Sequence, residues 1–374
     1  MRIAAAALLL CAAPLNAKVS IKEIQTVLRL RVAGDSARPL VEKLRASRQS
    51  PIVEGRNVAF VYEAGPGERP VLGGALTAGR GLAMQRLGSS NVFALVIEVD
   101  DRQKTTYSVY IGDEPRPDPW NPARTEDARS IVQMPKYRPP AELSSGPLRG
   151  RIEPFRVASK VLGRDCEGLL YVPEDSQPSR GMILLGGPVY RAGGAVEILD
   201  ALIARKRVPP VAAVLIDPFD RAEAYLDGSD RLARFLRDDL VPALQALHPI
   251  REVGLAGTAE AGWAAFHAAW AMPEAFPRVL TQSAAFQGAG RANPYPGIIR
   301  AAPLKHLIGW MSVSAHDRES DAGSFADGNH LVWGALRQRG YAFTFHDDDG
   351  YHDGFTWQRQ LPEAFVRLWS GAVQ

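Results

Sequence analysis

Cysteine is almost missing from this chain, which has two among its 374 residues. Cys11 lies in an apolar N-terminal run that we expect to be removed, so Cys166 is left alone and an intrachain disulfide is excluded from the mature chain. A nucleophilic Cys166 would need a base and an oxyanion site nearby, and its sequence surroundings offer neither. We therefore interpret Cys166 as a small residue beside a strand.

Strong charge and long apolar runs are missing as well. The formal net charge is only +3, and no basic run suggests nucleic acid as a partner. No segment has the roughly 20 consecutive apolar residues that a membrane-spanning helix needs. The run His346–Asp349 is interpreted as a solvated loop, because the chain shows no compact metal-ligand spacing. We expect no metal, no cofactor, no nucleic-acid partner and no membrane span.

The first 17 residues have the pattern of a secretory signal. Arg2 supplies a short positive region, Ile3–Ala13 is apolar but too short to span a bilayer, and the small residue Ala17 suits a cleavage site. We therefore expect the mature chain to begin near Lys18 and to be periplasmic or secreted.

Residues 18–135 are expected to form an all-β sandwich domain. Short β-favouring runs alternate there with glycine-rich breaks, at Val58–Tyr62, Ala94–Val99 and Thr105–Ile111. A short helix at Pro39–Arg45 is the one exception that the pattern suggests. Residues 136–150 are rich in proline, glycine and serine and are interpreted as a linker.

From residue 151 to residue 374 the pattern changes to apolar strands alternating with amphipathic helices. This alternation predicts a mostly parallel sheet with helices on both faces, whose ligands bind at the carboxyl ends of the strands. After a strand pair at Phe155–Leu162 and Glu167–Val172, the predicted strands are Met182–Leu185, Val211–Ile216, Glu252–Ala256, Arg278–Thr281, Leu307–Ser314 and Tyr341–Phe345. The predicted helices are Gly193–Arg205, Ser229–Leu247, Glu260–Met272, Gly328–Gln338 and Trp357–Trp369.

The stretch from Gly257 to Gly262 stands where a strand passes into a helix. That context is typical of the nucleophile elbow G-x-S-x-G, a sharp turn that exposes a serine hydroxyl above the sheet. The nucleophile position here holds Ala259, whose methyl group cannot attack an ester carbonyl. Thr258 carries a hydroxyl, but it stands one residue early, where its side chain should point away.

Three further groups follow predicted strands in the order expected of an acyl-transfer site. The glycine pair Gly186–Gly187 and the amide of Glu260 are candidate oxyanion donors, although a plain tight turn explains the glycines equally well. An acid, Asp317 or Glu319, follows the next-to-last strand, and His352 follows the last one. The order of nucleophile, acid and histidine makes His352 a candidate base. Ser283 also follows a strand, but outside an elbow, and is interpreted as structural.

The chain resembles the enterochelin (enterobactin) esterase-like hydrolases. The likeness is carried by the elbow Ala256–Ala265, by Thr281–Phe286, and by Gly350–Asp353 with Trp357 beyond it. The segments Pro117–Pro122 and Ser130–Pro135 resemble the Ig-like early-set domain that precedes the hydrolase domain in that family. The resemblance implies an α/β-hydrolase fold after an Ig-like sandwich, and hydrolysis of esters in siderophores or plant polysaccharides.

Carried over by position, the resemblance assigns His352 as the base, Glu319 as a better match to the acid than Asp317, and Gly187 and Glu260 as the oxyanion region. Three residues depart from the family at the reaction centre, namely Ala259, Ala261 and Tyr351.

We therefore expect a catalytically degenerate esterase that keeps a pocket for an ester-bearing, aromatic or siderophore-like molecule. One alternative is an active carboxylic ester hydrolase in which His352 activates water, or Thr258 attacks. A second alternative is a carbohydrate-binding or scaffold module. The aromatic residues of the first domain are too few to favour that alternative.

Overall fold

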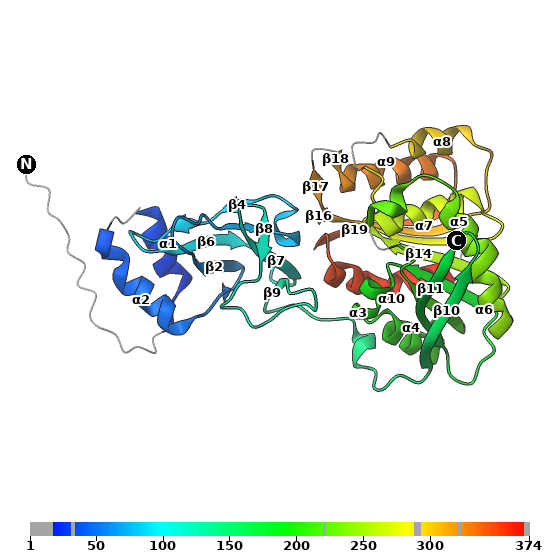
Figure 1. Ribbon diagram of the computed structural model, residues 1–374, viewed down its shortest axis with the longest axis horizontal. Helices are drawn as coiled ribbons and strands as arrows, with labels where there is room; N and C mark the ends of the chain where they lie inside the picture. Colours follow the sequence, from blue (N-terminus) through cyan, green and yellow to red (C-terminus); the bar gives the residue numbers. More distant parts are fainter. Residues whose placement is uncertain (1–17, 31–33, 220–221, 288–292, 321–322, 370–374) are drawn as a thin grey trace, which may run out of the picture. The chain divides into compact units, whose positions relative to one another are not determined.

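The computed structural model describes residues 18–30, 34–219, 222–287, 293–320 and 323–369 (Figure 1). The predicted signal segment lies outside these residues. The chain divides into two compact units, with the boundary between Arg138 and Pro139. Residues 139–150, which we expected to be linker, therefore belong to the second unit. Within the described segments, no helix has the length and apolarity that crossing a bilayer requires.

Two helices precede the sheets of the first unit, so this unit is not all-β as the sequence pattern suggested. Helix α1 (Ile21–Arg29) begins with a capping box in which Ser20 and Glu23 satisfy each other's backbone amides. Helix α2 (Arg38–Ser47) has a proline in its first turn and runs beyond the short helix predicted there. Both helices bury apolar residues in the same core cluster as strands β1 (Ile52–Glu54) and β2 (Asn57–Glu63).

The rest of the first unit consists of two antiparallel sheets. One has the order β1-β2-β6-β5, and the other has the order β4-β3-β7-β8 with β9 also paired to β7. The strands are β1 (Ile52–Glu54), β2 (Asn57–Glu63), β3 (Val71–Gly73), β4 (Leu82–Ala83), β5 (Gln85–Arg86), β6 (Val92–Glu98), β7 (Lys104–Ile111), β8 (Glu114–Arg116) and β9 (Ser130–Gln133), with short 3₁₀ turns η1 (Gly34–Ala37) and η2 (Ala75–Thr77).

The second unit is built on an eight-stranded sheet of order β10-β11-β13-β12-β14-β15-β16-β19. The pairings from β13 to β19 are parallel, and β10 and β11 add an antiparallel edge. The strands are β10 (Arg151–Ser159), β11 (Arg164–Val172), β12 (Arg180–Leu185), β13 (Val211–Ile216), β14 (Glu252–Thr258), β15 (Arg278–Gln282), β16 (Ile308–His316) and β19 (Ala342–Tyr351), and a separate short hairpin joins β17 (Glu319–Ser320) to β18 (Gly323–Ser324).

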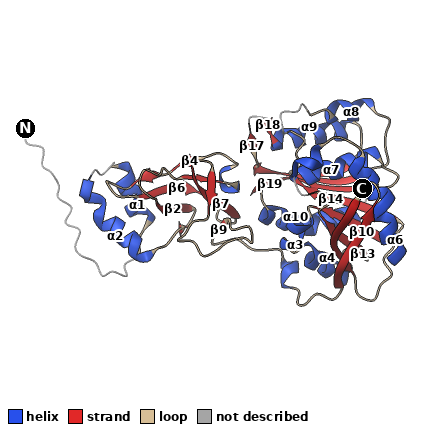
Figure 2. Ribbon diagram, viewed as in Figure 1, coloured by secondary structure: helices blue, strands red, loops and turns tan. Residues whose placement is uncertain are grey.

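Helices cover both faces of this sheet (Figure 2). Because successive side chains of a strand point to opposite faces, β12 sends Ile183 into one core cluster and Leu184 into the other. The first cluster includes side chains of α5, α6, α7, α8 and α9, and the second includes those of α3, α4 and α10. These helices are α3 (Gly187–Ala192), α4 (Ala195–Ala204), α5 (Arg231–Phe235), α6 (Val241–Leu247), α7 (Ala259–Ala271), α8 (Tyr295–Ala301), α9 (Phe325–Gln338) and α10 (Gly354–Trp369), with short 3₁₀ turns η3 (Ala141–Ser144) and η4 (Ala222–Leu226).

Several predicted elements differ in extent from the structure, and two of the differences have a clear physical cause. The helix expected over Ser229–Leu247 is interrupted by a π-helical turn, η5 (Leu236–Leu240), just before Pro242, which lacks the amide that a regular helix would use. The last strand was expected to end at Phe345, yet β19 continues to Tyr351 alongside β16. Its polar residues are tolerated because β19 lies at the edge of the sheet.

The arrangement of strands fixes where a site can form. Strands β14, β15, β16 and β19 are neighbours and run in parallel, so their carboxyl ends meet at one edge of the sheet. The residues that follow them are Ala259, Ser283, Asp317 and His352.

Candidate active site

Ala259 occupies a sharp turn between β14 and α7. Its φ of +49° places it in the left-handed region, which residues other than glycine seldom adopt. This is the backbone conformation of a strained strand-to-helix elbow, and α7 begins at Ala259 itself. A sharp turn therefore joins the strand to the helix where the sequence predicted one, and it is centred on Ala259.

Two glycines allow this turn to close. A Cβ atom on Gly257 would lie 2.2 Å from the carbonyl oxygen of Ala261, and one on Gly262 would lie 2.9 Å from the carbonyl oxygen of Gly257. Neither contact is tolerable, so the backbone crossing requires glycine at both positions. Ala261 stands where the esterase-like hydrolases that the sequence resembles have glycine. Its side chain is buried, and only its backbone atoms lie at the crossing.

Apolar side chains surround the Ala259 methyl group. Ala259, Ala285, Phe325 and Trp357 form one buried cluster, and Leu226 and Trp263 pack against it from partly exposed positions. The Ala285 amide also donates to the carbonyl of Ala259 at 2.9 Å, which ties the elbow to the loop after β15. The position that a serine hydroxyl would occupy thus lies in an apolar and largely aromatic setting.

His352 and Asp317 form a hydrogen-bonded pair beside this cluster. Nδ1 of His352 lies 2.5 Å from Oδ1 of Asp317, and their side chains are 15% and 1% exposed. A carboxylate on Nδ1 fixes the orientation of the ring and leaves Nε2 as the nitrogen for proton transfer. Asp317 is therefore the acid that the structure joins to His352.

The environment of Asp317 keeps its carboxylate ionised. Burial alone would raise the pKa of Asp317, but the hydrogen bond and charge of His352, together with hydrogen bonds from the Ser283 hydroxyl and the Arg318 amide, hold it below the usual value. The Ser314 amide also donates to Oδ2 at 3.2 Å. A negative charge is thus available to stabilise an imidazolium at His352.

Two aromatic rings enclose the His352 imidazole. Phe325 and Trp357 each meet it edge to face, with ring centroids 5.0 Å and 5.1 Å away. These rings restrict the approach of water and present apolar surface to any ligand beside Nε2. Trp357, five residues beyond the histidine, is one of the residues that carried the family resemblance.

Ser283, which we interpreted as merely structural, belongs to the same site. It follows β15 with a φ of +49° and is 1% exposed, and its hydroxyl helps to lower the pKa of Asp317. The indole Nε1–H of Trp357 donates to Ser283 Oγ at 3.3 Å. No local sequence signal marks this role, because a serine after a strand is common in turns.

The candidate oxyanion donors lie at the starts of two helices. Gly187 opens α3 after Gly186, whose φ is +73°, and Glu260 lies in the first turn of α7. The first amides of a helix have no intrahelical acceptor, and the Thr258 side chain does not cap α7. Gly187 also has a packing reason to be glycine, since a Cβ there would lie 2.7 Å from the amide nitrogen of Ile216.

The remaining predicted residues lie around this centre in different roles. Glu319, the acid that the resemblance favoured, is exposed on β17, whereas Asp317 is buried against His352. Thr258 has an extended backbone and is 5% exposed, at the last position of β14. The Glu260 carboxylate lies 4.0 Å from the Arg318 guanidinium, at the outer limit of an ion pair.

Polar residues along the edge strand pair with one another. His346 and Arg359 both contact Asp348, and His330 contacts Asp347 at 2.8 Å. Across the part of the chain that the structure describes, no three His, Cys, Asp or Glu side chains are grouped as a metal site.

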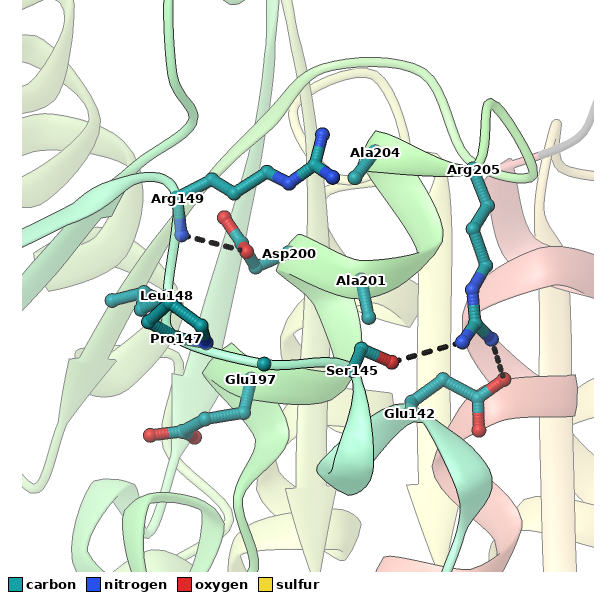
Figure 3. A pocket seen from close by; sticks show the side chains of 11 residues that line it. Glu142, Ser145, Pro147, Leu148, Arg149, Glu197, Asp200, Ala201, Ala204 and Arg205 are labelled. Atoms are coloured by element: carbon teal, nitrogen blue, oxygen red, sulfur yellow. Dashed lines mark hydrogen bonds and ion pairs between the residues drawn. The ribbon is translucent and has the colours of Figure 1, made fainter.

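A separate hollow of about 140 Å³ lies between residues 142–149 and helix α4 (Figure 3). Asp200 on its wall accepts hydrogen bonds from the amides of Arg149 and Gly150, and Arg205 binds Glu142 and Ser145. These contacts fasten the segment after the unit boundary to α4. None of the residues lining the hollow belongs to the site at Ala259.

Comparisons with known proteins agree on the fold of this chain. The enterobactin esterase of Shigella flexneri, crystallised in the presence of enterobactin, superimposes with a TM-score of 0.69 at 17% identity, over 84% of this chain and 93% of that chain. The ferric enterobactin esterase of Salmonella typhimurium gives the same TM-score of 0.69, at 17% identity over 84% of this chain and 93% of its own. The siderophore hydrolase EstB of Aspergillus nidulans gives 0.50 at 17% identity, over 62% of this chain and 97% of its own.

At these identities the likeness establishes an α/β-hydrolase-like fold and nothing about the substrate. No curated protein matches the sequence. A match to the family described as Putative esterase runs from residue 159 to residue 368 and includes the elbow, Asp317 and His352. Because this match spans more than half of the chain, the protein belongs to the putative esterase family.

Proposed function

We propose that this protein is a catalytically degenerate esterase that retains a pocket for an ester-bearing, aromatic or siderophore-like small molecule. The observation that carries the proposal is Ala259 at the elbow beside a complete Asp317–His352 pair. Without a hydroxyl at that position no acyl intermediate can form there, and only the weak residual catalysis of the remaining groups is left.

Two features favour retained binding over a scaffold with no ligand. Ala259 keeps a left-handed backbone that costs about 1 kcal/mol for a residue with a Cβ, although no nucleophile is left to benefit. Phe325 and Trp357 keep an apolar wall beside His352. One structural relative was crystallised in the presence of enterobactin, which makes an aromatic ester a reasonable first ligand to test.

Restoring the missing hydroxyl tests the chemistry directly. We expect the purified protein to hydrolyse p-nitrophenyl butyrate and phenyl acetate barely above background, and Ala259→Ser to raise the rate about 100-fold or more. Adding His352→Ala to Ala259→Ser should abolish the gain. Ala285→Ser is the matched control, because it adds a hydroxyl to the same buried cluster outside the elbow.

The opposite result would support the first alternative function. If the unmodified protein turns over either ester at about 1 s⁻¹ or faster, an ordinary enzyme rate, and His352→Ala removes that activity, the protein is an active ester hydrolase. His352 would then act on water, or Thr258 would be the nucleophile. Thr258→Val separates these two routes.

Binding is measured independently of turnover. Trp357 and Trp263 lie at the proposed pocket, so we expect enterobactin or ethyl ferulate to quench tryptophan fluorescence, and Trp357→Phe to reduce the effect. Lack of quenching by both probes would favour the scaffold alternative. A carbohydrate-binding role for the first unit gains little support. Of its candidate aromatic residues Tyr110 alone is partly exposed, and the others, Tyr62, Phe93, Tyr107 and Trp120, are each no more than 7% exposed.

The remaining sequence expectations are part of the same proposal. We assign the paired antiparallel sheets of the first unit to an Ig-like early-set domain, and residues 1–17 to a cleaved signal that sends the protein to the periplasm or outside the cell. Intact-mass measurement of protein recovered from the periplasm and the medium tests the second assignment, with a mature chain starting near Lys18 as the expected result.

A further inference from the structure

Ser283 stands beside the elbow at the same level of the sheet. Thr258 and Gln282 are register partners on the parallel strands β14 and β15, so the next residues, Ala259 and Ser283, end neighbouring strands together. Both have a φ of +49°. Glycine or asparagine is favoured over serine in the left-handed region. Contacts of the Ser283 side chain must therefore account for a serine at this position.

Two neighbouring side chains account for the presence of Ser283 there. Its hydroxyl accepts the indole N–H of Trp357 at 3.3 Å. The same hydroxyl acts on the Asp317 carboxylate and helps to hold the pKa of that acid below its usual value. Its amide donates to the carbonyl of Ser312 at 2.8 Å. This bond fixes the Ser283 backbone against β16, the strand that Asp317 follows. Because Ser283 is 1% exposed, water scarcely competes for these bonds.

Ser283 differs from the other donors to Asp317 in where it comes from. The amides of Ser314, in β16, and of Arg318 belong to the same stretch of chain as Asp317, within three residues of it. Ser283 belongs to β15, next to the elbow strand, and through Trp357 it is also tied to helix α10, which follows His352. It therefore relates the acid, the histidine and the elbow to one another.

We propose that Ser283 is a positioning residue whose hydroxyl, held between the Trp357 indole and the Asp317 carboxylate, orients the acid that binds His352. The inference builds on the proposed function, because it concerns the same acid–histidine pair. Ser283 is not offered as a substitute nucleophile, since its hydroxyl faces the carboxylate rather than the base and is almost fully buried.

The test follows the His352 ring by nitrogen NMR in protein with labelled histidine. When Asp317 is held correctly, its carboxylate selects the neutral tautomer with the proton on Nδ1. We expect that tautomer in the unmodified protein and a mixture of both tautomers in Ser283→Gly and Ser283→Ala. Ser283→Gly relieves the left-handed backbone and is expected to fold, so the change cannot be ascribed to strain.

Ser312→Ala is the matched control, because it also removes a buried hydroxyl, one that donates to Gln360 at 2.7 Å. It should leave the His352 tautomer unchanged. In the Ala259→Ser background, Ser283→Ala should lower kcat about tenfold with little change in KM. An unchanged tautomer in both Ser283 variants, or an Nε2-protonated ring in the unmodified protein, would overturn the proposal.

The two proposals fail in different ways. Should Ala259→Ser remain inactive, the NMR comparison still decides the role of Ser283, because it needs no turnover. Should the unmodified protein prove to be an active esterase, the proposed function falls, and the Ser283 variants can be compared by kcat in the unmodified chain.

Discussion

Asp317 Oδ1 lies 2.5 Å from His352 Nδ1, and the carboxylate that makes this contact has only 1% of its side chain exposed. The two residues follow neighbouring strands, β16 and β19, so the contact depends on the parallel pairing of those strands. It is the feature of the site most directly open to measurement.

Replacing Asp317 by asparagine should destabilise the fold at neutral pH by about 1–3 kcal/mol, because a buried charged hydrogen bond is lost. The pKa of Asp317 is depressed in the folded state, so its contribution is complete above the usual carboxyl pKa and is lost as the pH falls through the folded-state value. Urea unfolding of both proteins between pH 7 and about pH 3 should therefore show the difference shrinking with acidification. Asp347→Asn, at a side chain 67% exposed, should change stability far less.

Ala259→Gly should leave the free energy of unfolding unchanged or raise it by up to about 1 kcal/mol, since glycine accepts the left-handed backbone without the Cβ penalty. Ala268→Gly in the same helix is the comparison. Ala268 is fully buried within α7, so its loss should cost about 1 kcal/mol or more. Chemical denaturation measures the free energy of unfolding of both variants. Equal losses of stability in the two would show that the left-handed backbone at Ala259 is not strained.

Gly257→Ala should destabilise the second unit by about 3 kcal/mol, because the new Cβ would lie 2.2 Å from the Ala261 carbonyl oxygen. Gly297→Ala in helix α8 provides a control, since a Cβ there meets nothing within 4 Å. That change should stabilise the protein by about 0.5–1 kcal/mol through helix propensity. Thermal melting followed by circular dichroism distinguishes the two directions.

The pKa of His346 should lie above that of an ordinary histidine. The Asp348 carboxylate, 3.6 Å from the ring, raises the pKa of His346 against the opposing effect of burial. A raised folded-state pKa contributes stability below the usual histidine pKa, and this contribution is lost as the pH rises through the folded-state value. NMR titration of Asp348→Asn should move the His346 pKa back toward its usual value, while an unchanged value would contradict the pairing.

Much of the second unit was readable from the sequence. Apolar runs between helix-length segments located the six strands β12, β13, β14, β15, β16 and β19, since a strand buried on both faces must be apolar throughout. The errors arose where tertiary pairing outweighs local pattern. Polar residues after Phe345 suggested that the strand ends there, but pairing with β16 carries it on to Tyr351.

The choice of acid shows the same limit. Asp317 and Glu319 stand two residues apart, and sequence alone could not say which side chain turns toward His352. The structure separates them, because Asp317 still lies in the buried turn after β16 whereas Glu319 is already on the exposed hairpin strand β17. Ser283 was missed for a related reason, since its partners lie 34 and 74 positions further along the chain.

The sequence by itself determined that a tight turn between a strand and a helix would carry Ala259, because glycine spacing and the identity of Ala259 are local properties. Which side chains surround Ala259 was decided only by the tertiary structure. Parallel pairing of β14, β15, β16 and β19 brings their carboxyl ends to one edge, and side chains from four separate stretches of the chain meet there.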